Sequence, residues 1–453
     1  MNDQHAFERI VADSVQSIGP LAPSEGAHDL THSRAGQARQ DPKWLALLKE
    51  PPMRTNSHLA VGSPTVRVMV VMVMTMLLAL ALAAAGAGAK QLLAADGPIV
   101  VAEDGSGDYT TIGKAVEAAE DGDEILVKPG DYVEAVVIEK DITVRGDGPL
   151  EEIVIMAPED GPTADTGVSS GMSGQESYAL LLSDTEATLS GVTLRGAGAV
   201  VIASGGSPVL SGLHVDGVGK AYEGGGGAGG NSIVINGGST ATVRDNTITD
   251  GGPIGVFDLS EPLIEANTLV GGPHIWGGHG DSAVIRGNTI DGSLVRAVYV
   301  GDSASLTIEG NTFTNPGQDG VTVSEGSPVV LDNTISGASM AAVTVSGRGE
   351  PTISGNRLVD NNIAISWSAL DGLIEQNTVG GGKAGIVIGG GAPIVRDNTV
   401  EGVEGRGIVV AFGASPILSG NTSCDNVENL VVVKGATPED DGTNEICEDD
   451  APE

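Results

Sequence analysis

The chain has 453 residues, a formal net charge of −37 at pH 7 and only two cysteines. Such an acidic surface repels polyanions, which excludes a nucleic-acid partner held through its phosphates. Glycine accounts for 68 residues and aromatic residues for 3% of the chain, a composition that disfavours long helices and favours an all-β fold.

The first 66 residues are expected to form a cytoplasmic, partly disordered segment with short helices. Phe7, Ile10, Val11 and Ile18 recur at helical spacing. A second apolar cluster, "KWLALLKEPP", ends in prolines that stop any helix. A tether is the simplest role for this segment, and a cytosolic partner is the alternative.

Residues 67–89 are predicted to be a transmembrane signal anchor. The 22 residues from Val68 to Ala89 carry no charge, and a helix of that length spans about 33 Å, enough to cross a bilayer. Basic residues lie mostly before this run, which places the N-terminus in the cytoplasm and the rest outside the cell membrane. The alternative is a secreted protein, because Ala87-Gly88-Ala89 also fits signal-peptide cleavage.

The segment "DYTTIGKAVEAAEDGDEI" predicts one short helix at the start of the exported part. Thr110 or Thr111 can cap it, and Ile112, Val116 and Ala119 fall on one face. We expect this helix to cover the first turn of the fold that follows. Acidic and basic residues balance over residues 1–89, so the whole net charge lies beyond them.

Residues 97–435 are predicted to form a parallel β-helix of about a dozen coils. A phrase such as "VRDNTI" or "TISGNRL" recurs every 21–23 residues, with short runs of alternating polarity on either side. Stacked asparagines can form a hydrogen-bonded ladder, and asparagine tolerates the left-handed turn between strands. The repeated asparagines are Asn246, Asn267, Asn288, Asn311, Asn333, Asn356, Asn377, Asn398 and Asn421.

Two insertions interrupt the repeat, at residues 157–177 and 219–231. Both fall between the first and second strands of their coils. Insertions in a solenoid map to one face, which is often the binding face. We therefore expect them to wall a cleft.

The coil after Asn267, "TLVGGPHIWGGHGDSAVIRGN", is chemically unusual. An alignment by 21 residues sets Asp258 over His279, at a position that is Val300 in the next coil. Adjacent strands are about 5 Å apart, so the two side chains could pair as catalytic acid and base or as ligand groups. A bulge that turns both to solvent is the alternative. The expected ligand-binding residues nearby are Tyr222, Glu223, His274, Trp276 and Tyr299.

Residues 436–453 are expected to form an acidic C-terminal tail. If this region is exported, Cys424 and Cys447 are expected to form a disulfide that pins the tail, with free thiols as the alternative. No metal site or cofactor is predicted, although the acidic surface is compatible with Ca²⁺.

The "GNTI" phrase with its flanking strands resembles the repeat of the pectin-lyase-like superfamily. This resemblance covers residues 97–435 and implies a single-stranded right-handed parallel β-helix. The opening "VAEDGSGDYTTIGKAVEAAEDGDEILVKPG" is similar to the start of pectin methylesterases, but the esterase phrases "QDTL", "DFIFG" and "GRPW" are missing. "GHG" at Gly278–Gly280 resembles a polygalacturonase motif without its partner motifs. The resemblance therefore implies an architecture and leaves open whether the protein is an enzyme.

Two functions remain after this reading. The first is a membrane-tethered extracytoplasmic β-helix. It would bind polysaccharide of the cell envelope or the environment, or be displayed to that polysaccharide. The alternative is a carbohydrate-active enzyme (a lyase, hydrolase or epimerase) with its site beside the two insertions. The missing motifs favour the first.

Overall fold

The computed structural model describes residues 97–449 except 166–174, 197–198, 204, 219–229, 279 and 302. The chain divides into two compact units, residues 1–93 and 94–453. The predicted cytoplasmic segment and the predicted signal anchor at 67–89 lie outside the described residues. Within the described residues, no helix is both long enough and apolar enough to span a bilayer.

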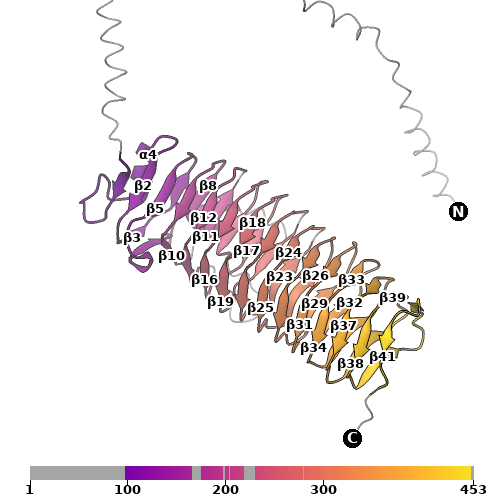
Figure 1. Ribbon diagram of the computed structural model, residues 1–453. Helices are drawn as coiled ribbons and strands as arrows, with labels where there is room; N and C mark the ends of the chain where they lie inside the picture. The colour runs from indigo at the N-terminus through magenta and orange to yellow at the C-terminus, as the bar shows by residue number, and fades with distance from the viewer. Residues whose placement is uncertain are drawn as a thin grey trace, which may run out of the picture. The chain divides into compact units, whose positions relative to one another are not determined.

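The second unit is a parallel β-helix of about 14 coils, somewhat more than the dozen predicted (Figure 1). Its described strands form three sheets of 15, 14 and 14 strands, which we call sheets 1, 2 and 3. A regular coil contributes one short strand to each sheet, whereas the sequence indicated only two clear strands per coil. Figure 1 shows the coils stacked in chain order, from indigo to yellow.

Sheet 1 contains β1 (Ile99–Val101), β2 (Glu124–Val127), β5 (Thr143–Gly146), β9 (Thr188–Ser190), β12 (Val209–Ser211), β15 (Thr242–Arg244), β18 (Leu263–Glu265), β21 (Val284–Arg286), β24 (Thr307–Glu309), β27 (Val329–Leu331), β30 (Thr352–Ser354), β33 (Leu373–Glu375), β36 (Ile394–Arg396), β39 (Ile417–Ser419) and β42 (Glu439–Asp440).

Sheet 2 contains β3 (Gly130–Val133), β6 (Ile153–Met156), β10 (Thr193–Arg195), β13 (His214–Asp216), β16 (Thr247–Thr249), β19 (Thr268–Val270), β22 (Thr289–Asp291), β25 (Thr312–Thr314), β28 (Thr334–Ser336), β31 (Arg357–Val359), β34 (Thr378–Gly380), β37 (Thr399–Glu401), β40 (Thr422–Cys424) and β43 (Glu445–Ile446).

Sheet 3 contains β4 (Val136–Ile138), β8 (Gln175–Ser183), β11 (Ala199–Ala203), β14 (Ile233–Ile235), β17 (Ile254–Val256), β20 (Ile275–Gly277), β23 (Arg296–Val300), β26 (Asp319–Val323), β29 (Ala341–Val345), β32 (Ile363–Trp367), β35 (Ala384–Ile388), β38 (Arg406–Val410) and β41 (Glu428–Val432). A further strand, β7 (Thr163–Asp165), pairs antiparallel with β8. A 3₁₀ turn, η1 (Leu150–Glu152), precedes β6.

The predicted helix is α4 (Ile112–Ala118), and it buries Ile112, Ala115 and Val116 against the first coils. Thr111 occupies the N-cap position but makes no side-chain cap. The Glu134 carboxylate instead accepts hydrogen bonds from the backbone N–H of Ile112 (2.8 Å) and Gly113 (2.9 Å). The cap therefore comes from a residue distant in sequence, which local pattern reading cannot find.

The interior is one apolar column built from like side chains in register. In sheets 1 and 2 the central residue of almost every three-residue strand points inward, as Ile264 in β18 and Leu269 in β19 do. The flanking residues of each strand face outward because side chains alternate along a strand. This alternation leaves the outer face of each sheet free to vary from coil to coil.

The asparagine ladder runs through the corner between sheets 1 and 2. Asn333 shows its pattern: its Oδ1 accepts from the backbone N (2.9 Å) and Nδ2 (2.9 Å) of Asn311, and its Nδ2 donates to Asn356 Oδ1 (3.0 Å) and Ile308 O (2.8 Å). Asn444 adds a tenth rung beyond Asn421. The asparagines do not take the left-handed conformation themselves. That conformation falls on the residue before each of the nine predicted asparagines, as in Asp332 (φ 54°), which precedes Asn333.

The segment predicted as an acidic tail belongs in part to the solenoid. Residues 439–440 and 445–446 form β42 and β43, which pair with β39 and β40 as a last partial coil. The ladder position at Asn444 explains this extension, because it continues the repeat 23 residues beyond Asn421.

Candidate functional site

Three aromatic side chains form a row on the outer face of sheet 3. The register places Gly255 of β17 beside Trp276 of β20, and Trp276 beside Tyr299 of β23. A Cβ atom on Gly255 would lie 2.5 Å from the Phe257 ring, so the absence of a side chain leaves room for that ring over the strand. Phe257 and Trp276 have ring centroids 5.5 Å apart, and Trp276 and Tyr299 are 6.0 Å apart. Both contacts are edge-to-face, an arrangement that aromatic pairs favour. We call these three residues the aromatic row.

The aromatic row begins in a small apolar cluster outside the main core. Phe257 is fully buried there with Tyr178 and Val234, and Trp276 lies partly buried against them. Ala164 of β7 also packs on this cluster. The described part of the first insertion therefore packs beside the aromatic row. The predicted cleft between the two insertions stays a prediction, because residues 166–174 and 219–229 lie outside the described residues.

Arg296 stacks on the far end of the aromatic row. Its Cζ lies 4.7 Å from the centroid of the Tyr299 ring, within cation–π distance. The in-register neighbour of Arg296 on β26 is Asp319. The Asp319 carboxylate is already used, because it accepts hydrogen bonds from Thr322 Oγ1 (3.0 Å), Thr344 Oγ1 (3.0 Å) and the backbone N of Ala341 (3.1 Å).

His274 lies just before β20 and is partly buried. Its backbone O accepts a hydrogen bond from the backbone N of Ile254 (2.9 Å). Burial, and to a smaller extent the nearby charge of Arg296, lower the pKa of His274 to about 4. The imidazole is therefore neutral at pH 7 and can donate one hydrogen bond and accept another.

The structure brings together His274, Trp276 and Tyr299 of the predicted ligand-binding set. Tyr222, Glu223 and His279 lie outside the described residues. Among the described residues, no acceptor is bonded to the buried indole Nε1 of Trp276. Arg296 and Phe257 were not predicted as site residues. For Phe257, the signal in the sequence was Gly255, a glycine inside a strand. For Arg296, the signal was the charged first residue of the strand "RAVYV".

The predicted alignment of Asp258 and His279 with Val300 was wrong. Val256 and Gly277, not Asp258 and His279, share the row of Val300. The step from Gly277 to Val300 takes 23 residues, so a fixed spacing of 21 residues shifts the alignment by two. Asp258 is exposed in the corner after β17, with a left-handed backbone (φ 57°).

A buried carboxylate fixes the corner after β20. Asp281 is fully buried, and its two oxygens accept hydrogen bonds from the backbone N of Ser260 (3.0 Å) and of Gly278 (3.1 Å). These bonds tie the "GHG" corner to the coil before it. The position of "GHG" at this corner is therefore explained by the hydrogen bonds of Asp281, the residue that follows the motif.

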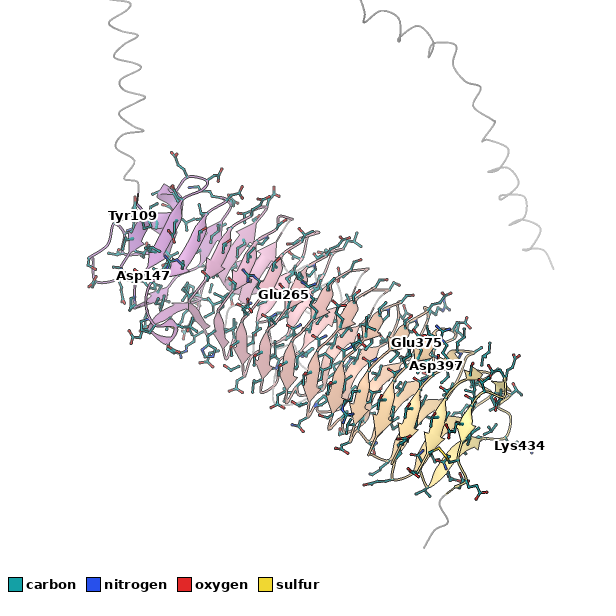
Figure 2. All side chains as sticks on the ribbon, in the orientation of Figure 1. Tyr109, Asp147, Glu265, Glu375, Asp397 and Lys434 are labelled. Atoms are coloured by element: carbon teal, nitrogen blue, oxygen red, sulfur yellow. A yellow bond between two sulfur atoms is a disulfide. The ribbon has the colours of Figure 1, made fainter. Side chains whose placement is uncertain are left out.

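The outer face of sheet 1 carries paired charges above shallow hollows. Arg286 bridges to Glu265 (2.7 Å) and Arg396 to Glu375 (2.6 Å), and Glu265 and Glu375 are labelled in Figure 2. Hollows of about 400 Å³ and 470 Å³ lie beside these two pairs. The two arginines on this face are therefore already paired with carboxylates.

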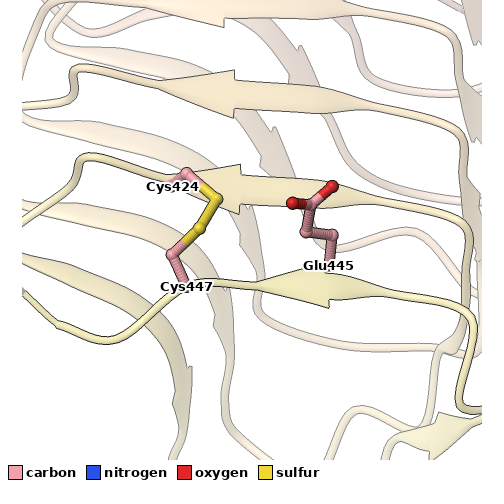
Figure 3. Close-up of side chains that lie close together, drawn as sticks. All are labelled: Cys424, Glu445 and Cys447. Atoms are coloured by element: carbon pink, nitrogen blue, oxygen red, sulfur yellow. A yellow bond between two sulfur atoms is a disulfide. The ribbon is translucent and has the colours of Figure 1, made fainter.

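The two cysteines are joined in a disulfide at the C-terminal end (Figure 3). Glu445 lies close to both sulfurs. Neither sulfur is a thiolate, so these three residues do not make a metal site. Asn429 adds to the attachment, since its backbone N donates to Asp449 Oδ1 (2.8 Å) and its Nδ2 to Glu448 O (2.9 Å).

Comparisons with known proteins agree on the fold. The family description "Right handed beta helix region" matches residues 272–423. The catalytic domain of a GH87 alpha-1,3-glucanase in complex with nigerose aligns with a TM-score of 0.51 at 13% identity, over 77% of this chain and 68% of that one. No curated protein matches the chain by sequence.

Two further solved structures align less closely. The periplasmic alginate epimerase AlgG has a TM-score of 0.45 at 12% identity, over 71% of this chain and 76% of that one. Tailspike protein 3 of bacteriophage CBA120 has a TM-score of 0.46 at 11% identity, over 77% and 60%. The family description and the alignment with the glucanase domain confirm the predicted right-handed parallel β-helix.

Proposed function

We propose that this right-handed β-helix binds polysaccharide along the outer face of sheet 3, with the aromatic row as its stacking platform. The observation that carries the proposal is the position of Trp276 and Tyr299 side by side in the outward row of sheet 3, where both side chains are partly exposed. Aromatic rings offer large rigid apolar faces, on which the C–H face of a sugar ring packs. The fold of the alpha-1,3-glucanase domain, which was solved with a bound sugar, is consistent with this use.

The proposal includes an extracytoplasmic, membrane-tethered location. The uncharged run at 68–89 and the orientation of the basic residues before it support the tether. The Cys424–Cys447 disulfide supports an oxidising compartment outside the cytoplasm. Fractionation of cells that express the full chain with a C-terminal tag tests this part: tag in the soluble secreted fraction alone would contradict the tether.

Binding is tested with the full chain against a panel of neutral and acidic polysaccharides. Trp276→Ala and Tyr299→Ala should each lower the affinity for any bound glycan by roughly tenfold or more, since the lost burial of a large apolar side chain costs about 1.5 kcal/mol or more. Ser366→Ala is the matched control, because Ser366 lies in the same outward row of sheet 3 away from the aromatic residues. Equal losses in all three variants, or none, would refute the assignment to the aromatic row.

The same panel detects catalysis. Reducing ends or unsaturated products that disappear in Asp258→Ala or His279→Ala would identify a carbohydrate-active enzyme. Binding without products identifies a polysaccharide-binding protein.

A further inference from the structure

Six of the nine arginines in the described residues form salt bridges, whereas Arg296, Arg348 and Arg357 do not. Of these three, Arg296 is the one whose guanidinium lies over an aromatic ring. The paired arginines in the described residues form salt bridges of 2.6–3.1 Å, and they are Arg145, Arg195, Arg244, Arg286, Arg396 and Arg406. Pairing is expected on a surface with such an excess of acid. Among the described residues, no carboxylate forms a salt bridge to Arg296, although Asp319 is its in-register neighbour.

The surroundings of Arg296 account for this difference. Both oxygens of Asp319 accept hydrogen bonds, from Thr322, Thr344 and the Ala341 backbone. These bonds direct the carboxylate toward β26, its own strand, and toward the next strand, β29. The guanidinium instead lies over Tyr299. Tyr299 is itself fixed, because its hydroxyl shares a hydrogen bond with Ser324 Oγ (2.8 Å). Stacking uses the face of the guanidinium and leaves the N–H donors at its edge available.

The positive charge at this position is not neutralised by its neighbours. Its field reaches His274, where it disfavours a second positive charge. A free cation beside aromatic rings matches a sugar that carries an acidic group, because the ring can pack on the aromatic row while the acid meets Arg296. An arginine fork fits a carboxylate through two parallel hydrogen bonds.

We propose that Arg296 recognises a carboxylate on a sugar residue whose ring packs against Trp276 and Tyr299. This inference rests on the proposed polysaccharide-binding function. The net charge of −37 disfavours a polymer with an acid on every residue. The ligand class is therefore an otherwise neutral glycan with sparse carboxylated residues.

The test compares matched pairs of oligosaccharides, each built of neutral sugars with one uronic acid, and each also with that carboxylate reduced to an alcohol. The full chain should bind the acid form at least roughly tenfold more tightly, as expected for a charge-assisted hydrogen bond. Arg296→Gln should remove this preference, so that the variant binds the acid and reduced forms with equal affinity. Arg296→Lys should keep part of it, because lysine retains the charge without the fork.

Arg286→Gln is the control, since Arg286 is on sheet 1 and already paired with Glu265. It should keep the full preference for the acid form. Equal binding of acid and reduced forms by the unaltered protein would overturn the inference and leave polysaccharide binding intact. Binding of neither form in any pair would overturn both.

Discussion

His274 shows how burial and one neighbouring charge together lower the pKa of a single residue. Its pKa falls from 6.5 to about 4, first through burial and then through Arg296. We expect Arg296→Gln to raise this pKa partway, because burial remains. Titration of the His274 ring by NMR checks this, and an unchanged pKa would show that the charge of Arg296 does not reach the ring.

The same shift fixes the sign of a pH effect on stability. The unfolded chain protonates His274 near pH 6.5, whereas the folded protein resists protonation until about pH 4. The contribution of this residue to stability is thus complete above pH 6.5 and declines as the pH falls toward 4. Replacement of His274 by Gln should flatten that part of the stability curve, measured by chemical unfolding at each pH.

Asn333 represents the rungs of the ladder. Asn333→Ala would leave the backbone N and Nδ2 of Asn311, Ile308 O and Asn356 Oδ1 short of one partner each, all inside the coil. We expect a loss of about 3 kcal/mol or more, because buried polar groups without partners are costly. Thermal unfolding measures the loss, with the exposed Thr312→Ala as control. Similar melting temperatures for both variants would mean that water replaces the rung.

Among the elements, β17 depends on its central glycine. In Gly255→Val the new side chain would collide with the Phe257 ring, which a Cβ atom alone approaches to 2.5 Å. We expect a loss of about 1–3 kcal/mol from overpacking and a changed near-ultraviolet spectrum of the aromatic row. Ser366→Val on β32 places the same side chain in the same row without a ring above it, and should be tolerated. If both variants behave alike, Phe257 does not require the glycine.

The last partial coil, β42 and β43, depends on the disulfide. The bond joins two residues with a sequence separation of 23. By restricting the unfolded chain, a loop of this length adds roughly 3 kcal/mol to the free energy of unfolding. Because coils in a solenoid contact only their neighbours, reduction should speed hydrogen exchange at β43 and leave β29 unchanged. Faster exchange at β29 as well would indicate that the solenoid unfolds as one cooperative unit.

At the scale of the whole molecule, charge governs which polymers can approach. A fully acidic polymer such as polygalacturonate should bind poorly at low ionic strength. Its binding should improve as salt shortens the screening length from about 30 Å at 0.01 M to about 8 Å at 0.15 M. Affinity measured across that range tests this. A decrease with salt, the usual behaviour of basic proteins, would reveal a positive track in the chain.

The sequence predicted the solenoid well because its evidence is local and repeated. The sequence left open whether each coil has two strands or three, because the corner between sheets 1 and 2 is short. Only Asp245 and Asn246 separate β15 from β16, so two strands look like one. The site was predicted only in part. Trp276 could be predicted because tryptophan is rare in this chain. Whether Arg296 forms a salt bridge depends on the hydrogen bonds that Asp319 makes. The spacing of residues in the sequence does not reveal those hydrogen bonds.

The regular corner before each asparagine also makes the coil a unit that can be removed. Deletion of residues 311–332 would join Gly310 directly to Asn333, so a left-handed residue would still precede an asparagine. The ladder would close from Asn288 to Asn333, and β23 would meet β29 in place of β26. Arg296 would then lie beside Ala341 instead of Asp319. Ligand binding by a shortened protein of this kind would show what Asp319 contributes separately from the aromatic row, and no residue would need to be substituted.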